Sequence, residues 1–174
     1  LRCLVGSEMC IRDRDIIALA KGLGGGFPVG AVMAKAKVGD AMIPGTHGST
    51  FGGNPLAMRS ANAVLDLLLE DDFLKSLREN ITYFDNKMDA LINDDDKVSP
   101  VILCKKGSGM LRGFQLTENV AAGDFGNISR EKGLLLVGAA ENTIRLLPPL
   151  NTSKEEIDQA FEILSEVVKE IKKN

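Results

Sequence analysis

The chain has 174 residues, of which 44% are hydrophobic and 26% charged, with a formal net charge of −3. This composition indicates a globular protein with one sizeable core, and lysines scattered among acidic residues give no basis for binding nucleic acid. No apolar run approaches the roughly 18 residues of a membrane span and no signal-peptide pattern opens the chain, so we expect a cytoplasmic protein without a membrane partner.

Metal-ligating residues are sparse. The cysteines are Cys3, Cys10 and Cys104, an odd number without metal-ligand spacing, and His47 is the sole histidine. We therefore expect neither a metal site nor a disulfide framework.

Residues 1–14, LRCLVGSEMCIRDR, differ in composition from the rest of the chain. They hold two of the three cysteines and show neither helical nor strand periodicity. The segment resembles a sequencing adapter translated in frame with a truncated read. We expect it to be non-native, and a natural loop or terminal extension is the alternative.

From Asp15 onward, apolar runs, glycine clusters and amphipathic segments alternate, which is typical of layered α/β structure. Two neighbouring strands are predicted over residues 16–20 and 29–34. Asn54 is a plausible N-cap, and Pro55 is the first residue of a helix that runs toward residue 69.

A second helix is predicted from Asp72 because apolar residues recur every three or four positions. This stripe, which we expect to pack in a core, comprises Leu74, Leu77, Ile81, Phe84, Met88 and Leu91. The acidic run at 94–96 should end the helix as a solvated turn, since it lacks the spacing of a calcium loop.

A smaller sheet is predicted beyond Pro100, with strands over residues 101–104, 109–116, 134–137 and 143–147. A short helix should lie between residues 120 and 132. The last helix should begin at Thr152 or Ser153, with Glu155 or Glu156 completing a capping box. Its buried face on the small sheet should comprise Ile157, Phe161, Leu164, Val168 and Ile171.

The most informative stretch is DIIALAKGLGGGFPVGA, residues 15–31, in which Lys21 ends an apolar strand and four glycines come soon after it. Burial at a strand end would lower the pKa of a lysine and supply the neutral amine that reacts with an aldehyde. Glycines beside it let the backbone approach a flat ring and a phosphate. A surface lysine beside a flexible turn is the alternative.

This stretch is similar to the lysine region of class-III, fold-type-I aminotransferases, with Arg14 where their proline stands. A second block, HGSTFGGNPLA at residues 47–57, is similar to the loop that in this family contributes to the phosphate site of the neighbouring subunit. The order and interval of the two blocks suit the family. The resemblance extends over residues 15–174.

The resemblance implies an α/β fold, the C-terminal part of the pyridoxal-phosphate-dependent transferase fold. Residues 15–55 would be a remnant of the large-domain sheet, 56–71 a connecting helix and 72–174 a small C-terminal α/β domain. We expect the small domain to be compact. The strands before residue 55 should expose apolar faces, because they lack the parallel neighbours of a whole enzyme.

The resemblance also assigns roles to four residues. Lys21 would hold pyridoxal phosphate covalently and shuttle a proton, and Thr50 would donate to the phosphate of the partner subunit. Ser49 would touch substrate, and Arg145 would bind the substrate carboxylate through two hydrogen bonds. The alternatives are a simple turn at Ser49 and Thr50, and an edge-strand arginine paired with a local acid at Arg145.

The implied reaction transfers the ω-amino group of N-acetylornithine to 2-oxoglutarate in arginine biosynthesis, within a homodimer. Ornithine, succinylornithine and 4-aminobutyrate are the alternative donors. In the family the phosphate turn, the stacking aromatic and the aspartate at the pyridine nitrogen lie upstream of the lysine, and none is assignable here. We therefore expect the chain to be an incomplete, inactive fragment of an enzyme. The alternative of a different functional class is a non-catalytic fragment that can only fold and associate.

Overall fold

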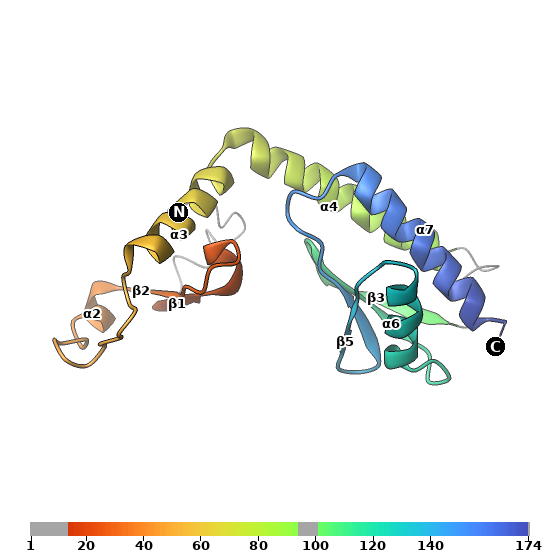
Figure 1. The fold of residues 1–174 in the computed structure, drawn as a ribbon, viewed down its shortest axis with the longest axis horizontal. Helices are drawn as coiled ribbons and strands as arrows, with labels where there is room; N and C mark the ends of the chain where they lie inside the picture. The colour runs from red at the N-terminus through yellow and green to blue at the C-terminus, as the bar shows by residue number, and fades with distance from the viewer. Residues whose placement is uncertain (1–13, 94–100, 174) are drawn as a thin grey trace. The chain divides into compact units, whose positions relative to one another are not determined.

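A two-stranded antiparallel hairpin begins the part of the chain that the computed structural model describes, residues 14–93 and 101–173 (Figure 1). Strand β1 (Ile16–Leu19) pairs with β2 (Ala31–Ala34), and Ile17 lies opposite Met33. The 3-10 helix η1 (Lys21–Gly24) comes after β1. These elements belong to the first of two compact units, and the division along the chain falls between Leu74 and Lys75.

Two helices complete the first unit. The single turn α2 (Ala36–Gly39) comes after β2, and α3 (Pro55–Leu68) begins after an exposed loop. The side-chain oxygen of Asn54 accepts a hydrogen bond from the Ala57 N–H at 2.9 Å, and Pro55 is the first helical residue. The predicted start of this helix is therefore confirmed.

Little of the first unit is buried. Ala57 and Ala61 of α3 are its buried apolar residues among those described, whereas large apolar side chains are exposed, namely Ile16, Val32, Met42, Ile43, Phe51, Leu56, Met58, Leu65, Leu67 and Leu69. The expectation of exposed apolar faces is thus confirmed. In the described residues the hairpin has no third strand.

The second unit contains a four-stranded antiparallel sheet in the order β3-β4-β6-β5. Its strands are β3 (Ile102–Ser108), β4 (Leu111–Leu116), β5 (Val137–Ala139) and β6 (Thr143–Leu146). Its helices are α4 (Asp71–Ile92), whose first turn lies in the first unit, α6 (Ala122–Glu131) and α7 (Lys154–Ile171). The predicted acidic turn at 94–96 and the segment 1–13 lie outside the described residues.

Two predicted strands differ from the structure by three or more residues at one end. Strand β3 continues to Ser108 because its polar half pairs with β4 across a tight turn. Strand β5 begins at Val137, because Leu134 is used to end α6: its N–H donates to the Ser129 carbonyl at 2.9 Å, and Gly133 has a φ of 93°. This is the Schellman arrangement, and it delays the strand.

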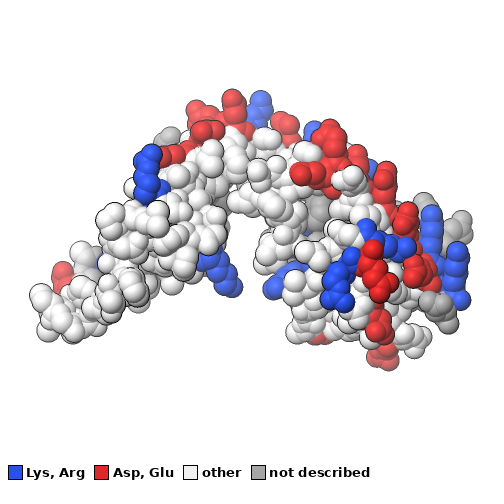
Figure 2. All heavy atoms as spheres, in the orientation of Figure 1, with Lys and Arg blue, Asp and Glu red and all other residues white. Residues whose placement is uncertain are grey.

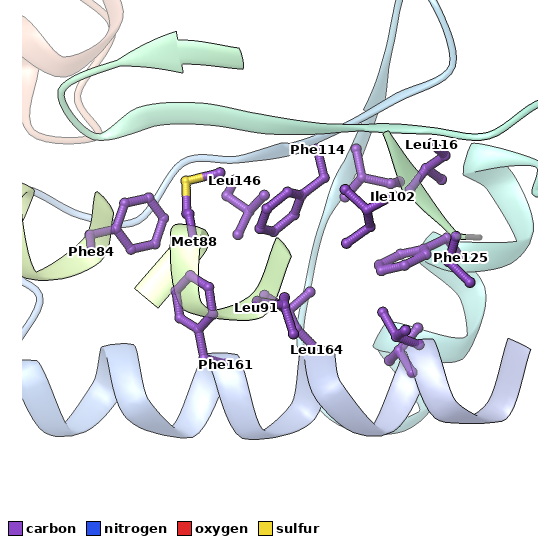
Figure 3. Close-up of a cluster of buried hydrophobic side chains, with 14 of the residues drawn as sticks. Phe84, Met88, Leu91, Ile102, Phe114, Leu116, Phe125, Leu146, Phe161 and Leu164 are labelled. Atoms are coloured by element: carbon purple, nitrogen blue, oxygen red, sulfur yellow. The ribbon is translucent and has the colours of Figure 1, made fainter. Parts of the chain in front are cut away.

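Helices cover one face of the sheet and form the core with it (Figure 3). Phe114 and Ile144 of the sheet are fully buried with Met88 of α4 and Phe125 of α6. The stripe on α4 is buried at Phe84, Met88 and Leu91, and half-buried at Leu74, Leu77 and Ile81. On α7 the predicted residues are buried except Ile171, which is half-buried, and Val167 is buried as well.

Charged side chains of both signs mix over the helices of the second unit (Figure 2). Lys132, for example, forms an ion pair with Glu170 of α7 at 2.9 Å. Among the described residues, none of the helices is long and apolar enough to cross a membrane.

A polar cluster on the surface joins α4 to α7. Asp158 forms an ion pair with Lys87 at 2.5 Å and accepts a hydrogen bond from the Tyr83 hydroxyl at 2.7 Å. The hydrogen bond from Lys87, together with the smaller effect of that from Tyr83, lowers the pKa of the Asp158 carboxyl. The cluster thus adds a pH-dependent contact between the helices.

Replacing Ser153 by alanine should destabilise the second unit by about 1 kcal/mol, because the capping box at the start of α7 would be lost. In the structure the Ser153 hydroxyl accepts from the Glu156 N–H at 3.2 Å, and the Glu156 carboxylate accepts from the Ser153 N–H at 2.8 Å. Urea unfolding measures the loss. Ser76→Ala on the exposed surface of α4 is the control, and equal midpoints for the two variants would contradict the prediction.

Replacing Asp158 by asparagine should destabilise the protein at neutral pH but not in acid. The pKa of Asp158 in the folded state lies below its unfolded value of about 3.9, so its stabilisation is present above that value and is lost as the pH falls through the folded pKa. Urea midpoints of wild type and variant should converge below about pH 4. A gap that stays constant from pH 7 to pH 3 would show that the carboxylate charge is not responsible.

Candidate functional site

Lys21 has an unusual backbone conformation. It is the first residue of η1, two residues after β1 ends, and its φ is 53°. A residue with a Cβ rarely adopts this left-handed conformation, and it costs free energy unless the surroundings enforce it. The outlier marks Lys21 as a position held in place by its neighbours.

The Lys21 side chain lies at a shallow depression, whose lining residues are Lys21, Gly22, Gly25, Gly26, Phe27, Pro28 and Val29. Its amine is exposed and has no hydrogen bond or ion pair among the described residues. The predicted burial at a strand end was therefore wrong for this chain. The described residues of the first unit provide no layer that would cover the lysine.

Helix α3 supports the turn behind Lys21. The Ser60 hydroxyl donates a hydrogen bond to the Gly24 carbonyl oxygen at 2.7 Å. A Cβ on Gly25 would lie 2.9 Å from Cγ2 of Val64 on the same helix, so glycine is what allows the contact. Sequence reasoning did not single out Ser60. The signal available was the small side chains of Ala57, Ser60 and Ala61 at helical spacing.

Ser49 and Thr50 lie in the exposed loop between α2 and α3. Their turn is closed by the Gly52 N–H, which donates to the Ser49 carbonyl at 3.2 Å. The Asn54 side chain then donates to the Phe51 carbonyl at 2.8 Å, which ties the loop to the start of α3. No hydrogen bond among the described residues joins either hydroxyl to Lys21. Both hydroxyls are open to an anionic ligand.

Arg145 lies in the second unit, on the interior strand β6. Its neighbours Ile144 and Leu146 are buried, whereas Arg145 is exposed on the opposite face of the sheet. In the described part of the chain its guanidinium has no acidic partner. The alternative of an edge-strand arginine paired with a local acid is therefore not supported.

Gly113 lies directly opposite Arg145 on β4. A Cβ there would come within 2.7 Å of Cγ2 of Thr143 and 3.0 Å of the Ile144 carbonyl oxygen. Gly113 is buried, and the Thr143 methyl group fills the place where its side chain would begin, so the absence of a side chain allows β4 to lie close to β6 beside Arg145. A glycine inside a predicted strand often marks a close approach of the neighbouring strand, so Gly113 could have been identified from the sequence.

A second cation shares this face. Lys106 of β3 lies opposite Gly113 and forms an ion pair with Glu141 at the β5–β6 turn. The hydrogen bond from Lys106 lowers the pKa of Glu141. Lys106 is therefore already engaged, whereas Arg145 is free to bind a carboxylate. Within the described ranges, no group of three or more potential ligands could hold a metal ion.

Comparison with known proteins places these features in one family. The family model described as aminotransferase class-III matches residues 9–168, beginning within the opening segment. The chain is 43% identical over 155 residues to an acetylornithine aminotransferase of Streptococcus mutans, an alignment that covers 89% of this chain and 39% of the relative. The chain thus spans about two fifths of the length of such curated relatives.

Solved structures agree. An acetylornithine aminotransferase from Elizabethkingia anophelis superposes with a TM-score of 0.78 at 34% identity, over 94% of this chain and 41% of that one. An ornithine delta-aminotransferase from Plasmodium falciparum gives a TM-score of 0.81 at 30% identity, over 93% and 41%. The fold is therefore a partial transferase fold of mixed α/β type. Together with the match over residues 9–168, this shows that the chain belongs to the class-III aminotransferases.

Proposed function

We propose that the whole protein transfers the ω-amino group of N-acetylornithine to 2-oxoglutarate with pyridoxal phosphate as cofactor. The observation that carries the proposal is the Lys21 turn. A lysine with a left-handed backbone presents an unpaired amine at a depression that is lined in part by glycine, in a chain of the class-III family. A surface lysine beside a flexible turn would need neither the strained backbone nor the packed glycines.

The described residues fit one side of the cofactor. Pyridoxal phosphate supplies an aldehyde that condenses with amines and a ring that withdraws electrons. Lys21 offers the amine, and Gly22 and Gly26 leave open space beside it, since a Cβ on either would meet nothing within 4 Å. Thr50 and Ser49 offer exposed hydroxyls of the kind that bind phosphate and substrate oxygens.

Lys21 has two tasks in this proposal. Its amine holds the cofactor when no substrate is present, and once a substrate amine replaces it, the free amine moves a proton at the substrate carbon that carries nitrogen. Both tasks require a side chain that returns to the same place after each exchange. The η1 turn supports this requirement, because Gly24 at its end is buried and accepts a hydrogen bond from Ser60 of α3.

Thr50 and Ser49 are proposed to contact cofactor and substrate from the loop between α2 and α3. We infer that Thr50 donates its hydroxyl and backbone N–H to the cofactor phosphate of a partner subunit, and that Ser49 contacts substrate. The exposure of the loop supports a role across a homodimer interface. Two copies of the chain would then complete each other's sites.

Arg145 is proposed to bind the substrate carboxylate. Its planar guanidinium offers two parallel N–H donors, a geometry that matches a carboxylate. Arg145 is exposed and has no acidic partner among the described residues, and Lys106 does not compete because Glu141 engages it. We therefore propose Arg145 as the group that recognises 2-oxoglutarate and the amino-acid product.

N-Acetylornithine is favoured as donor because the acetylornithine relative is 43% identical to this chain. Ornithine is the second candidate, favoured by the TM-score of 0.81 to the Plasmodium falciparum ornithine enzyme. The whole protein, in our proposal, works in the cytoplasm in arginine biosynthesis. The chain alone spans about two fifths of its relatives, and we propose that it folds without catalysing the reaction. Comparing turnover of the two donors by the whole protein tests the assignment.

Replacing Lys21 by alanine should abolish covalent binding of pyridoxal phosphate at this site and nearly all amino transfer by the whole protein, because the reactive amine is removed. Visible absorbance of the bound cofactor and glutamate formation measure the two losses. Lys37→Ala, at an exposed lysine of α2, is the control and should behave like wild type. Retention of the cofactor absorbance by the Lys21→Ala protein would refute the proposed role.

Replacing Thr50 by alanine in the whole protein should raise the Kd for pyridoxal phosphate by about 10- to 100-fold, because a hydrogen bond to a charged phosphate is lost. At saturating cofactor kcat should change little, since Thr50 takes no part in proton transfer. Fluorescence titration gives the Kd. Thr46→Ala in the same loop is the control, because the Thr46 hydroxyl already donates to the Ile43 carbonyl at 2.6 Å. Equal Kd values for the two variants would argue against a phosphate contact at Thr50.

A further inference from the structure

Ser60 connects helix α3 to the turn that carries Lys21. Its hydroxyl donates to the Gly24 carbonyl oxygen at 2.7 Å, and the two residues are 36 positions apart in sequence. Among the described residues, no other side-chain hydrogen bond joins η1 to another element. The bond is half-buried, so water competes for it less than at an exposed site.

Packing confines the turn around this bond. A Cβ on Gly24 would approach Cγ1 of Val29 to 2.7 Å, and one on Gly25 would approach Cγ2 of Val64 to 2.9 Å. At Gly24 and Gly25 the turn therefore lies close against the segment that leads to β2 and against α3. The hydrogen bond from Ser60 opposes movement of the turn away from α3.

The same turn sets the conformation of Lys21. Gly24 ends the four-residue helix that Lys21 begins, and its carbonyl also accepts the Phe27 N–H at 2.9 Å. The left-handed backbone of Lys21, with a φ of 53°, is costly for lysine and persists only where surrounding contacts over-determine it. Anchoring of Gly24 three residues away is such a contact.

We propose that Ser60 is a positioning residue for Lys21. It touches neither cofactor nor substrate, and it acts by fixing Gly24, and through the turn the direction in which the Lys21 amine points. The inference rests on the proposed function of Lys21 as the amine that reacts with pyridoxal phosphate. A merely structural Ser60 would change stability and leave the reactivity of Lys21 untouched.

The test uses the whole protein and pyridoxal phosphate itself. Borohydride fixes the adduct that each lysine amine forms with the aldehyde, and mass spectrometry compares labelling at Lys21 with labelling at the exposed Lys37. Ser60→Ala should lower the Lys21 to Lys37 ratio by about 2- to 10-fold, the range expected for losing one net hydrogen bond. Ser60→Thr keeps the hydroxyl and should restore the ratio.

Asn62→Ala, at an exposed position of the same helix, is the matched control and should leave the ratio unchanged. Amide hydrogen exchange of Gly25 and Phe27 reports the turn separately, because their N–H groups bond to Gly22 and Gly24 within it. Alanine is the best helix former, so Ser60→Ala should preserve α3.

An unchanged labelling ratio in Ser60→Ala would overturn the proposal, even if amide exchange at the turn became faster, because Ser60 would then be structural alone. A ratio of Lys21 to Lys37 labelling near one in the wild-type protein would contradict a different step. It would refute the proposed reactivity of Lys21, and the positioning role of Ser60 would fall with it. A reduced ratio that Ser60→Thr restores and Asn62→Ala does not reproduce would support the inference.

Discussion

Close contact between a glycine turn and a helix face of small side chains is the constraint on which the candidate site depends. Gly24 and Gly25 can lie against Val29 and Val64 only because they lack a Cβ. A four-residue 3-10 helix has too few hydrogen bonds to persist alone, so its shape is imposed by α3. Lys21 is the first residue of this helix and has a left-handed backbone. The direction of its amine therefore depends on the packing of the residues that support the turn.

The second unit fixes its candidate residue in a different way. Strand alternation sends Ile144 and Leu146 into the core and Arg145 to the opposite face. Since helices cover the core face, the other face is the one that can meet a ligand (Figure 3). Regular pairing with β4 and β5 holds the Arg145 backbone, and Gly113 opposite it allows the close contact between β4 and Thr143 of β6.

The sequence predicted those features that depend on local pattern. Asn54 and Ser153 are caps with short-range partners, and both helices begin where predicted. Strand β5 was misplaced because Leu134 ends a helix, a choice that depends on Gly133 adopting a positive φ. The hydrogen bond from Ser60 to Gly24, which supports the Lys21 turn, could not be predicted because the two residues are 36 positions apart in sequence. The roles of Lys21, Ser49, Thr50 and Arg145 came from resemblance, because the residues alone left simpler alternatives open.

Helix α3 is the common support of both candidate cofactor contacts in the first unit. Its N-cap, Asn54, accepts from Ala57 and donates to Phe51, so the helix begins where the loop of Ser49 and Thr50 ends. Ser60 then anchors the Lys21 turn less than two helical turns further on. A disturbance at the start of α3 would therefore reach the loop of Ser49 and Thr50 and the turn of Lys21 together, so the two proposed cofactor contacts depend on the same helix.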